Sequence, residues 1–213
     1  MSRSRYVVLS AATHLAALLF LAGVSLYAQD LGENDAAPLA ATPKPATPFQ
    51  MPSARERFHR YLLDAYGPAA LLGAAITAGT DQPANAPPEW KQGAAGFERR
   101  FGSRFGQFAV AETARFGLAT MLHEDTTYRP CECRAVLPRL GHALLASFTA
   151  RSADGHRVFS VPDLAAPYAG GLVATGAWYP ARYGPKDGIR LGTWAIGIHT
   201  GVNIVREFLP RGR

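Results

Sequence analysis

The chain has 213 residues, enough for one domain with a buried core and short processing segments. Only 18% of the residues are charged against 48% hydrophobic, and the 21 glycines and many alanines favour close helix packing. The net charge is +6, but Arg3 and Arg5 belong to a targeting segment, and the remaining 20 basic and 16 acidic residues form no cluster. We therefore expect no nucleic-acid partner.

Residues 1–28 have the layout of a secretory signal peptide, with a basic start, an apolar middle and a plausible cleavage site after Ala28. Leu26 stands where a small residue is usual, and the 24 residues from Tyr6 to Gln29 carry no charge, so an uncleaved membrane anchor is the alternative. In both cases the arginines stay inside and the rest of the chain is exported. The expected location is the periplasm or the cell envelope, with or without membrane association.

Residues 29–52 are rich in proline, alanine and threonine, which predicts a flexible linker with little to bury. The composition changes at Ser53, and Ser53-Ala54-Arg55-Glu56 matches the capping box that opens a helix. Residues 53–210 therefore form the predicted domain. The first helix should end at Tyr66-Gly67-Pro68, where the chain bends and a second helix begins.

The centre of the chain is the stretch from Phe97 to His142, whose first half fits one long helix. A helix with an aromatic ridge and a groove of small residues is a central packing helix. The ridge comprises Phe97, Phe101, Phe105, Phe108 and Phe116, and the groove comprises Gly102, Gly106, Ala109, Thr113, Gly117 and Thr120.

A loop rich in proline precedes this helix at residues 80–92, and Trp90 is expected to pin it to the core. After the long helix, another helix is expected to open near Leu137. Residues 153–156 read Ala-Asp-Gly-His between apolar residues, which predicts a β-hairpin. Helix then resumes near Asp163.

The last part of the chain is apolar but does not resemble a clean membrane span. Residues 164–181 carry no charge, yet they are mostly alanine and glycine and include two prolines, so they insert weakly into a membrane. Residues 187–209 form an amphipathic pattern that predicts a domain helix. Thr193, Gly197 and Gly201 repeat a small-residue spacing that would suit packing against the groove at Gly102.

Polar side chains in the centre of the chain are the candidates for chemistry. Glu112, Arg115 and His123 project from the same sector as the phenylalanines. One hypothesis places His123 and His142 with Glu112, Glu124 or Asp125 in one cleft, as an acid/base pair or a metal site. The structural alternative pairs Glu124 and Asp125 with the arginines that follow them, which are Arg129, Arg134 and Arg139.

Two further groups have a functional and a structural interpretation. Cys131 and Cys133 are the only cysteines and can pair with each other in an oxidising compartment. His199, Asn203 and Arg206 line one polar face of the last helix, as a ligand-binding face or as a solvated one. No catalytic, nucleotide-binding or zinc motif is present, so we expect no metal and no cofactor.

The order of the segments PPEWKQGAAGFERRFGSRFGQ, HEDTTYRP and AWYP resembles a group of uncharacterised exported helical proteins found widely in acidobacterial genomes. The resemblance covers roughly residues 55–210. The group has no assigned activity, cofactor or catalytic residue. The resemblance therefore implies export and a helical domain, and it implies no activity.

The sequence predicts a compact all-α domain of about five or six helices with one short β-hairpin, preceded by a signal peptide and a linker rich in proline and alanine. Its expected role is that of an envelope structural or binding protein without catalytic activity, in contact with a membrane surface, a lipid or an envelope protein. The alternative is an envelope hydrolase that uses His123 with Glu112 or Asp125.

Overall fold

The computed structural model describes residues 49–209. The predicted signal peptide and most of the predicted linker fall on residues 1–48 and lie outside the described residues. Phe49, at the end of the predicted linker, contacts the domain, because its ring lies 5.1 Å from the guanidinium of Arg129 and 5.6 Å from that of Arg151.

The described residues form a predominantly helical domain, as predicted, with a small antiparallel sheet. Its helices are α2 (Ala54–Tyr66), α3 (Pro68–Asp81), α4 (Gly93–Leu122), α5 (Val136–Ala146), α6 (Val161–Ala177) and α7 (Pro185–Phe208), with a 3₁₀ turn at Pro88–Trp90. Its strands are β1 (Glu124–Asp125), β2 (Thr149–Ser152) and β3 (Arg157–Phe159).

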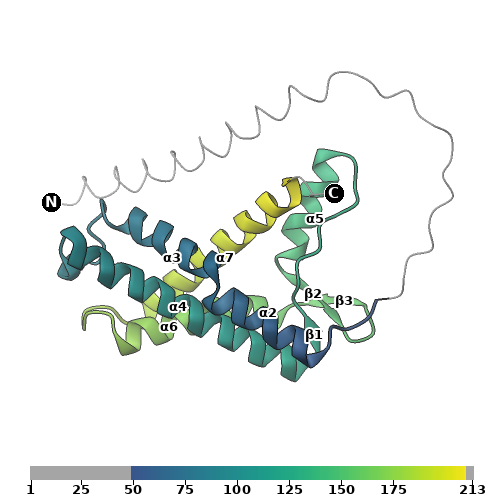
Figure 1. Cartoon of the computed structure of the whole chain (residues 1–213), viewed down its shortest axis with the longest axis horizontal. Helices are drawn as coiled ribbons and strands as arrows, with labels where there is room; N and C mark the ends of the chain where they lie inside the picture. Colours follow the sequence, from purple (N-terminus) through teal and green to yellow (C-terminus); the bar gives the residue numbers. More distant parts are fainter. Residues whose placement is uncertain (1–48, 210–213) are drawn as a thin grey trace, which may run out of the picture. The chain divides into compact units, whose positions relative to one another are not determined.

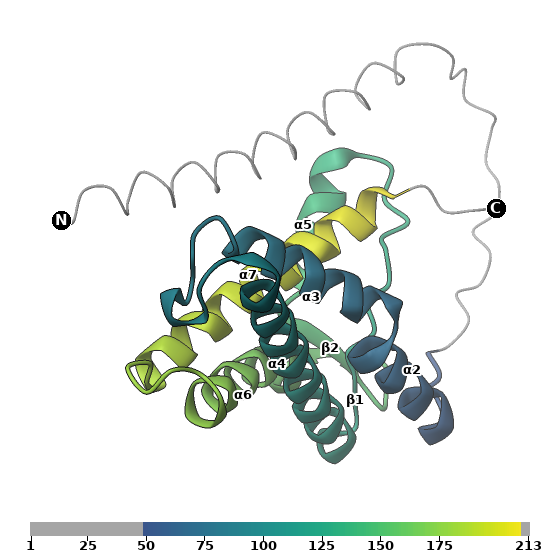
Figure 2. The same ribbon diagram turned by 60° about the vertical axis from the view of Figure 1, so that its left-hand side comes forward.

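Helices α2 and α3 follow one another along α4 and run antiparallel to it (Figures 1 and 2). Helix α6 packs antiparallel on α4, and α7 packs antiparallel on α6. The side-chain contacts give the directions. Tyr61 of α2 meets Thr113 of α4, and Asp81 of α3 meets Arg104 of α4. Helix α5 packs against the C-terminal half of α7 and leads into the sheet.

Several predicted boundaries are confirmed. Ser53 and Glu56 form the capping box of α2, with Ser53 N donating to Glu56 Oε2 at 2.8 Å and Glu56 N donating to Ser53 Oγ at 3.2 Å. Helix α2 ends at Gly67, and Pro68 opens α3 because proline suits the first position of a helix. The predicted hairpin is β2–β3, and β1 adds a third strand that pairs with β2.

The aromatic ridge of α4 packs partly on α2. The Phe116 ring stacks on Tyr61 with centroids 4.8 Å apart, and the Phe105 ring meets Tyr66 edge-on at 6.2 Å. Trp90 is half-buried and its ring lies 5.0 Å from that of Tyr179, so the proline-rich loop contacts the turn after α6.

The predicted contact between the small-residue groove at Gly102 and the last helix is wrong. A Cβ added at Gly102, Gly197 or Gly201 would meet nothing within 4 Å. The close helix contact lies instead between α6 and α7. A Cβ at Gly171 would come within 2.2 Å of the Gly188 carbonyl oxygen, and one at Gly192 within 2.5 Å of the Tyr168 ring. Small residues are needed there because the two backbones nearly touch.

Arg100 organises the loop between α3 and α4 from the inside. Its side chain is fully buried and donates five hydrogen bonds of 2.7–3.1 Å. The acceptors are the backbone carbonyls of Ala86, Pro87 and Lys91 and the side-chain oxygens of Gln82 and Asn85. All five acceptors are neutral, and together they accept hydrogen bonds from all three guanidinium nitrogens.

Large apolar side chains face outward on several helices, whereas the buried apolar residues of the described domain are alanines and a few prolines such as Pro162 and Pro167. On α7, Trp194 and Ile198 are 54% and 50% exposed, and Asn203 and Glu207 are each 1% exposed. The predicted amphipathic helix is therefore present with its apolar face outward. On α3, Leu72 and Ile76 are 62% and 60% exposed.

Candidate functional site

A polar cleft lies between α2, α4 and β1. Its volume is about 60 Å³, and it is lined by charged side chains from all three elements. They are Arg57, Arg60 and Asp64 from α2, Glu112 and Arg115 from α4, and Glu124 and Asp125 from β1. Phe116 and Ala119 of α4 form an apolar part of its wall.

Glu112 and Arg115, one turn apart on α4, line the cleft, and Arg115 also reaches Asp163 of α6, which is not part of the cleft wall. Arg115 Nη1 donates to both Glu112 oxygens, at 2.7 and 2.9 Å. Arg115 Nε lies 3.1 Å from Asp163 Oδ1, within ion-pair distance but without the alignment of a hydrogen bond. One arginine therefore compensates two buried carboxylates.

Burial raises the pKa of Asp163, although Arg115 and the Ser160 hydroxyl oppose the shift. Burial also raises the pKa of Glu112 against the attraction of Arg115, and the charges of Asp64 and Asp163 add to the rise. Burial and the charge of Asp163 raise the pKa of Glu124. Protonation of these carboxyl groups is thus easier than in water, mainly because burial disfavours their charged forms.

Arg57 and Glu124 line the cleft with buried polar atoms that have no hydrogen-bond partner within residues 49–209. Glu124 is 8% exposed, and its Oε2 atom is buried without a hydrogen bond. Arg57 is half-buried, and its Nε and Nη1 atoms are likewise buried without a hydrogen bond. Native proteins satisfy nearly all buried polar atoms, so unsatisfied guanidinium and carboxylate atoms in one cleft are unusual.

Asp125 is fully engaged, in contrast to its neighbour Glu124. Its Oδ2 accepts from Arg129 Nη2 at 2.6 Å, and its Oδ1 accepts from the backbone and hydroxyl of Thr127 at 3.1 and 2.5 Å. Burial opposes ionisation of Asp125, but Thr127 and Arg129 outweigh it, so the pKa of Asp125 lies below its usual range. The predicted pairing of Asp125 with Arg129 is present.

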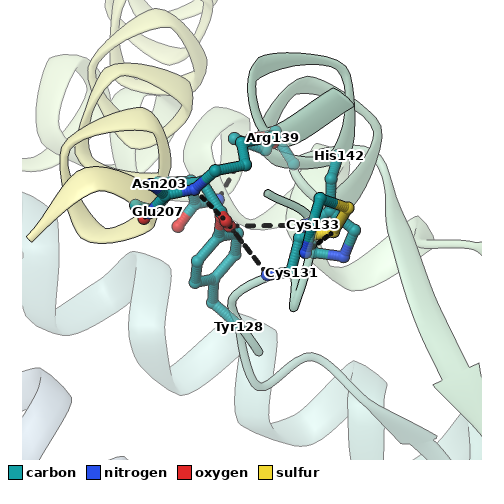
Figure 3. Close-up of polar contacts among 9 residues, drawn as sticks. Tyr128, Cys131, Cys133, Arg139, His142, Asn203 and Glu207 are labelled. Atoms are coloured by element: carbon teal, nitrogen blue, oxygen red, sulfur yellow. Dashed lines mark hydrogen bonds and ion pairs between the residues drawn. A yellow bond between two sulfur atoms is a disulfide. The ribbon is translucent and has the colours of Figure 1, made fainter. Parts of the chain in front are cut away.

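A second polar centre surrounds Glu207 near the end of α7, shown in Figure 3. The Glu207 carboxylate accepts from the Tyr128 hydroxyl, from the Cys131 backbone N–H at 3.0 Å and from Arg139 Nε at 3.3 Å. His142 Nδ1 lies 3.4 Å from Glu207 Oε2. Burial opposes ionisation, but these donors outweigh it and hold the pKa of Glu207 below its usual range.

A disulfide joins Cys131 and Cys133 beside this carboxylate (Figure 3). Because Cys131 also donates its backbone N–H to Glu207, the small disulfide ring is tied to α7. Tyr128, Arg139 and His142 flank the ring from the loop and from α5. These contacts fix the segment after β1 to the end of α7. The disulfide therefore has a structural role here.

Asn203 is buried and His199 is half-buried beside it, so neither belongs to a fully solvated face. Asn203 Nδ2 donates to Ser147 Oγ at 3.1 Å and lies 3.1 Å from His199 Nε2. Burial and the charges of Arg115 and Arg206 lower the pKa of His199 to about 4. Arg206 itself is exposed.

The candidate catalytic residues are distributed over separate places. Glu112 and Asp125 line the cleft beside α2, whereas His123 is exposed at the C-terminal end of α4 and is not part of the cleft wall. His142 lies beside Glu207 on α5. The structure therefore brings Glu112, Arg115 and Asp125 to one cleft that contains neither histidine, and both Asp125 and His142 line a second pocket of about 40 Å³.

Three residues that the sequence did not single out for a site are prominent in the structure. Glu207 continues the His199 and Asn203 face by another four residues, so the helical spacing could have revealed it. Arg57 and Asp163 come from elements far apart in the chain, and no local pattern connects them.

The arrangement can bind charged groups. Within residues 49–209, no group of three or more histidine, cysteine, aspartate or glutamate residues is placed to hold a metal ion. The cleft offers cationic and anionic side chains side by side, which suits recognition of a polar ligand. Comparison of the chain with protein-family models, with curated proteins and with solved structures gives no match.

Proposed function

We propose that the chain is an exported, non-enzymatic envelope protein whose helical domain rests in a lipid membrane. The observation that carries this proposal is the inverted distribution of side chains. Large apolar groups such as Leu72, Ile76 and Trp194 face outward, and Arg100, Asn203 and Glu207 are buried. In water, each large apolar side chain left exposed forfeits about 1.5–3 kcal/mol of burial free energy, and monomeric soluble proteins rarely expose such surfaces widely.

The charge distribution along the helices supports the same proposal. Residues 65–80 and 164–181 carry no charged side chain, and residues 191–205 carry only His199, whose lowered pKa keeps it neutral near pH 7. Between residues 105 and 122, the two charged residues Glu112 and Arg115 pair with each other. Charged groups within a membrane normally pair and face the interior of a helix bundle.

Aromatic residues gather at one end of the bundle. Trp90, Tyr179 and Tyr183 form edge-on ring contacts with centroids 5.0 and 5.4 Å apart, at the turn between α6 and α7. Tryptophan and tyrosine are enriched where a membrane meets water. Within the described residues, only the continuous stretch Ala54–Asp81 is long and apolar enough to cross a membrane by length and composition, and it bends at Gly67–Pro68.

The test is a membrane extraction combined with a lipid-contact measurement on the full chain. Membranes from a bacterial expression host are washed with high salt and alkaline carbonate, and we expect the protein to be released only by detergent. An uncleaved anchor would give the same result, so the second measurement reconstitutes the protein in vesicles that contain brominated lipid. Bromine quenches tryptophan fluorescence on contact, and Trp194→Phe should remove a large part of the quenching.

Trp90→Phe is the matched control, because Trp90 is half-buried in the loop against Tyr179. We expect it to leave most of the quenching in place. Release of the protein by salt alone, or quenching that does not depend on Trp194, would contradict the membrane location.

A further inference from the structure

The cleft between α2, α4 and β1 contains two opposite charges that have no partner within the described domain. Glu124 of β1 makes no hydrogen bond or ion pair through its buried Oε2 atom, and Arg57 of α2 leaves two buried guanidinium nitrogens without acceptors. Of the other charged groups of the cleft wall, Asp64 is exposed and the rest are engaged. Arg115 binds Glu112, and Arg60 binds Thr127 beside Asp125.

Leaving both groups buried and unpaired is costly. A charged group that is buried without a partner loses its hydrogen bonds to water and gains none in the protein. Arg57 and Glu124 could relieve this cost by pairing with each other, yet no ion pair joins them although both line the cleft. A group placed between them would have to accept hydrogen bonds from Arg57 and donate to Glu124.

The charge of the cleft decides which ligand fits. Its wall carries three arginines, Arg57, Arg60 and Arg115, and four acidic side chains. A simple anion would bind Arg57 but would add negative charge beside Glu124. A simple cation would bind Glu124 and leave Arg57 unpaired. A zwitterion adds no net charge and satisfies both groups, since its anionic end can accept from Arg57 and its cationic end can donate to Glu124.

We propose that this cleft binds a small zwitterion, with its oxyanion on Arg57 and its primary ammonium group on Glu124. About 10–15 Å³ of comparable volume holds one water molecule, so a cleft of about 60 Å³ has room for a few non-hydrogen atoms, such as the ends of a head group. The proposal does not depend on the membrane location, because binding of a soluble ligand can be measured in detergent solution whichever way the extraction experiment ends.

Two sources offer this chemistry. A phospholipid with a phosphoethanolamine head group carries a phosphate and an ammonium group, and a free amino acid carries a carboxylate and an ammonium group. Calorimetric titrations of the purified full chain with glycerophosphoethanolamine and with glycine distinguish them. Binding of the first alone indicates a lipid head group, and binding of the second alone indicates a free amino acid.

Glycerol 3-phosphate and ethanolamine are the single-charge probes, and we expect both to bind at least about tenfold more weakly than the preferred zwitterion. Arg57→Gln and Glu124→Gln should each weaken zwitterion binding by about tenfold or more, because each removes one charged partner. Glu124→Gln should leave the affinity for glycerol 3-phosphate unchanged or increased.

Arg55→Gln and Glu132→Gln are the controls, since both residues are exposed and neither lines the cleft. Thermal unfolding of all four variants verifies that the fold is retained, which we expect because Arg57 and Glu124 form no contact that holds it together. Binding of glycerol 3-phosphate or ethanolamine as tight as that of the preferred zwitterion would overturn the proposal, and so would a wild-type cleft that binds none of the probes and takes up only water.

Discussion

Glu207 shows how one buried carboxylate can hold three segments together. It accepts hydrogen bonds from the loop at Tyr128 and Cys131 and from Arg139 of α5, while it belongs to α7. We predict that Glu207→Ala lowers the free energy of unfolding by about 3–5 kcal/mol, because it leaves a cation and two donors without their acceptor. Denaturant unfolding in detergent measures the loss. The exposed Glu132 is the control, and Glu132→Ala should change stability by less than about 0.5 kcal/mol.

The lowered pKa of His199 predicts how the stability of the protein depends on pH. Its pKa in the folded protein is about 4, against an unfolded value of 6.5. Between these values the unfolded chain binds a proton that the folded chain does not, so stability falls as the pH falls from 6.5 to 4. At about 1.4 kcal/mol per pKa unit, the full contribution is about 3 kcal/mol. His199→Gln should flatten this dependence, and stability measured from pH 7 to 4 in both proteins tests it.

The change in stability caused by His199→Gln isolates this contribution, because the carboxyl groups of the cleft titrate in both proteins. Glu112 and Asp163 have raised pKa values and therefore act in the opposite direction, since they favour the folded state as the pH falls. If the stability of wild type and of His199→Gln changed with pH in parallel, the pKa of His199 would not be lowered in the folded protein, and the prediction would be wrong.

At the level of single residues, the sequence identified about half of the polar interior. Glu112 and Arg115 stand out because they interrupt a line of phenylalanines, and the structure indeed pairs them. Asp163 and Arg57 could not be found in this way. Each is an ordinary charged residue in the first turns of an ordinary helix, and it becomes distinctive only when another element packs over it.

Helix positions were predictable because their signals are local. The capping box at Ser53, the Gly67–Pro68 break and the Asp154-Gly155 turn each act within a few residues of chain. The two-residue strand β1 was not predicted, since a strand this short has no periodicity and exists only through its pairing with β2.

Helix faces were harder to predict than helix positions. The amphipathic pattern of residues 187–209 is correct, but the usual rule that the apolar face turns inward assumes that water surrounds the protein. In α7, Gly188, Gly192, Asn203 and Glu207 turn inward. The close contact with α6 requires small residues, and the buried polar residues find partners on α5 and in the loop before it.

The α6–α7 contact gives a prediction at the level of elements. We expect Gly171→Ala to destabilise the protein by about 1–3 kcal/mol, because the new methyl group would collide with the Gly188 carbonyl. Gly176→Ala, on the same helix, meets nothing within 4 Å and should stabilise the protein by about 0.5–1 kcal/mol through its higher helix propensity. Thermal unfolding of both variants tests the contact, and two shifts of the same sign would contradict it.

At the level of the whole domain, the outward apolar side chains lead to a prediction about solvent. Ile198→Glu places a charge on the outer face of α7, where Ile198 is 50% exposed. A charge at the centre of a membrane helix costs roughly 2.5–3.5 kcal/mol, so we expect less protein in the membrane fraction and more in the soluble fraction. Arg190→Glu, near the start of α7, is the control and should leave the partition unchanged. In a domain surrounded by water, Ile198→Glu would instead increase solubility without a change of compartment.

The loop between α3 and α4 is built around Arg100 much as a metalloprotein loop is built around its ion, except that this cation is covalently part of the chain and cannot be chelated away. Three of its five acceptors are backbone carbonyls, which every amino acid supplies. The side chains at Ala86, Pro87 and Lys91 are therefore free to vary as long as the backbone can follow the same path. The loop is thus a permissive place for new surface chemistry, whereas lysine in place of Arg100 would supply too few donors to keep its shape.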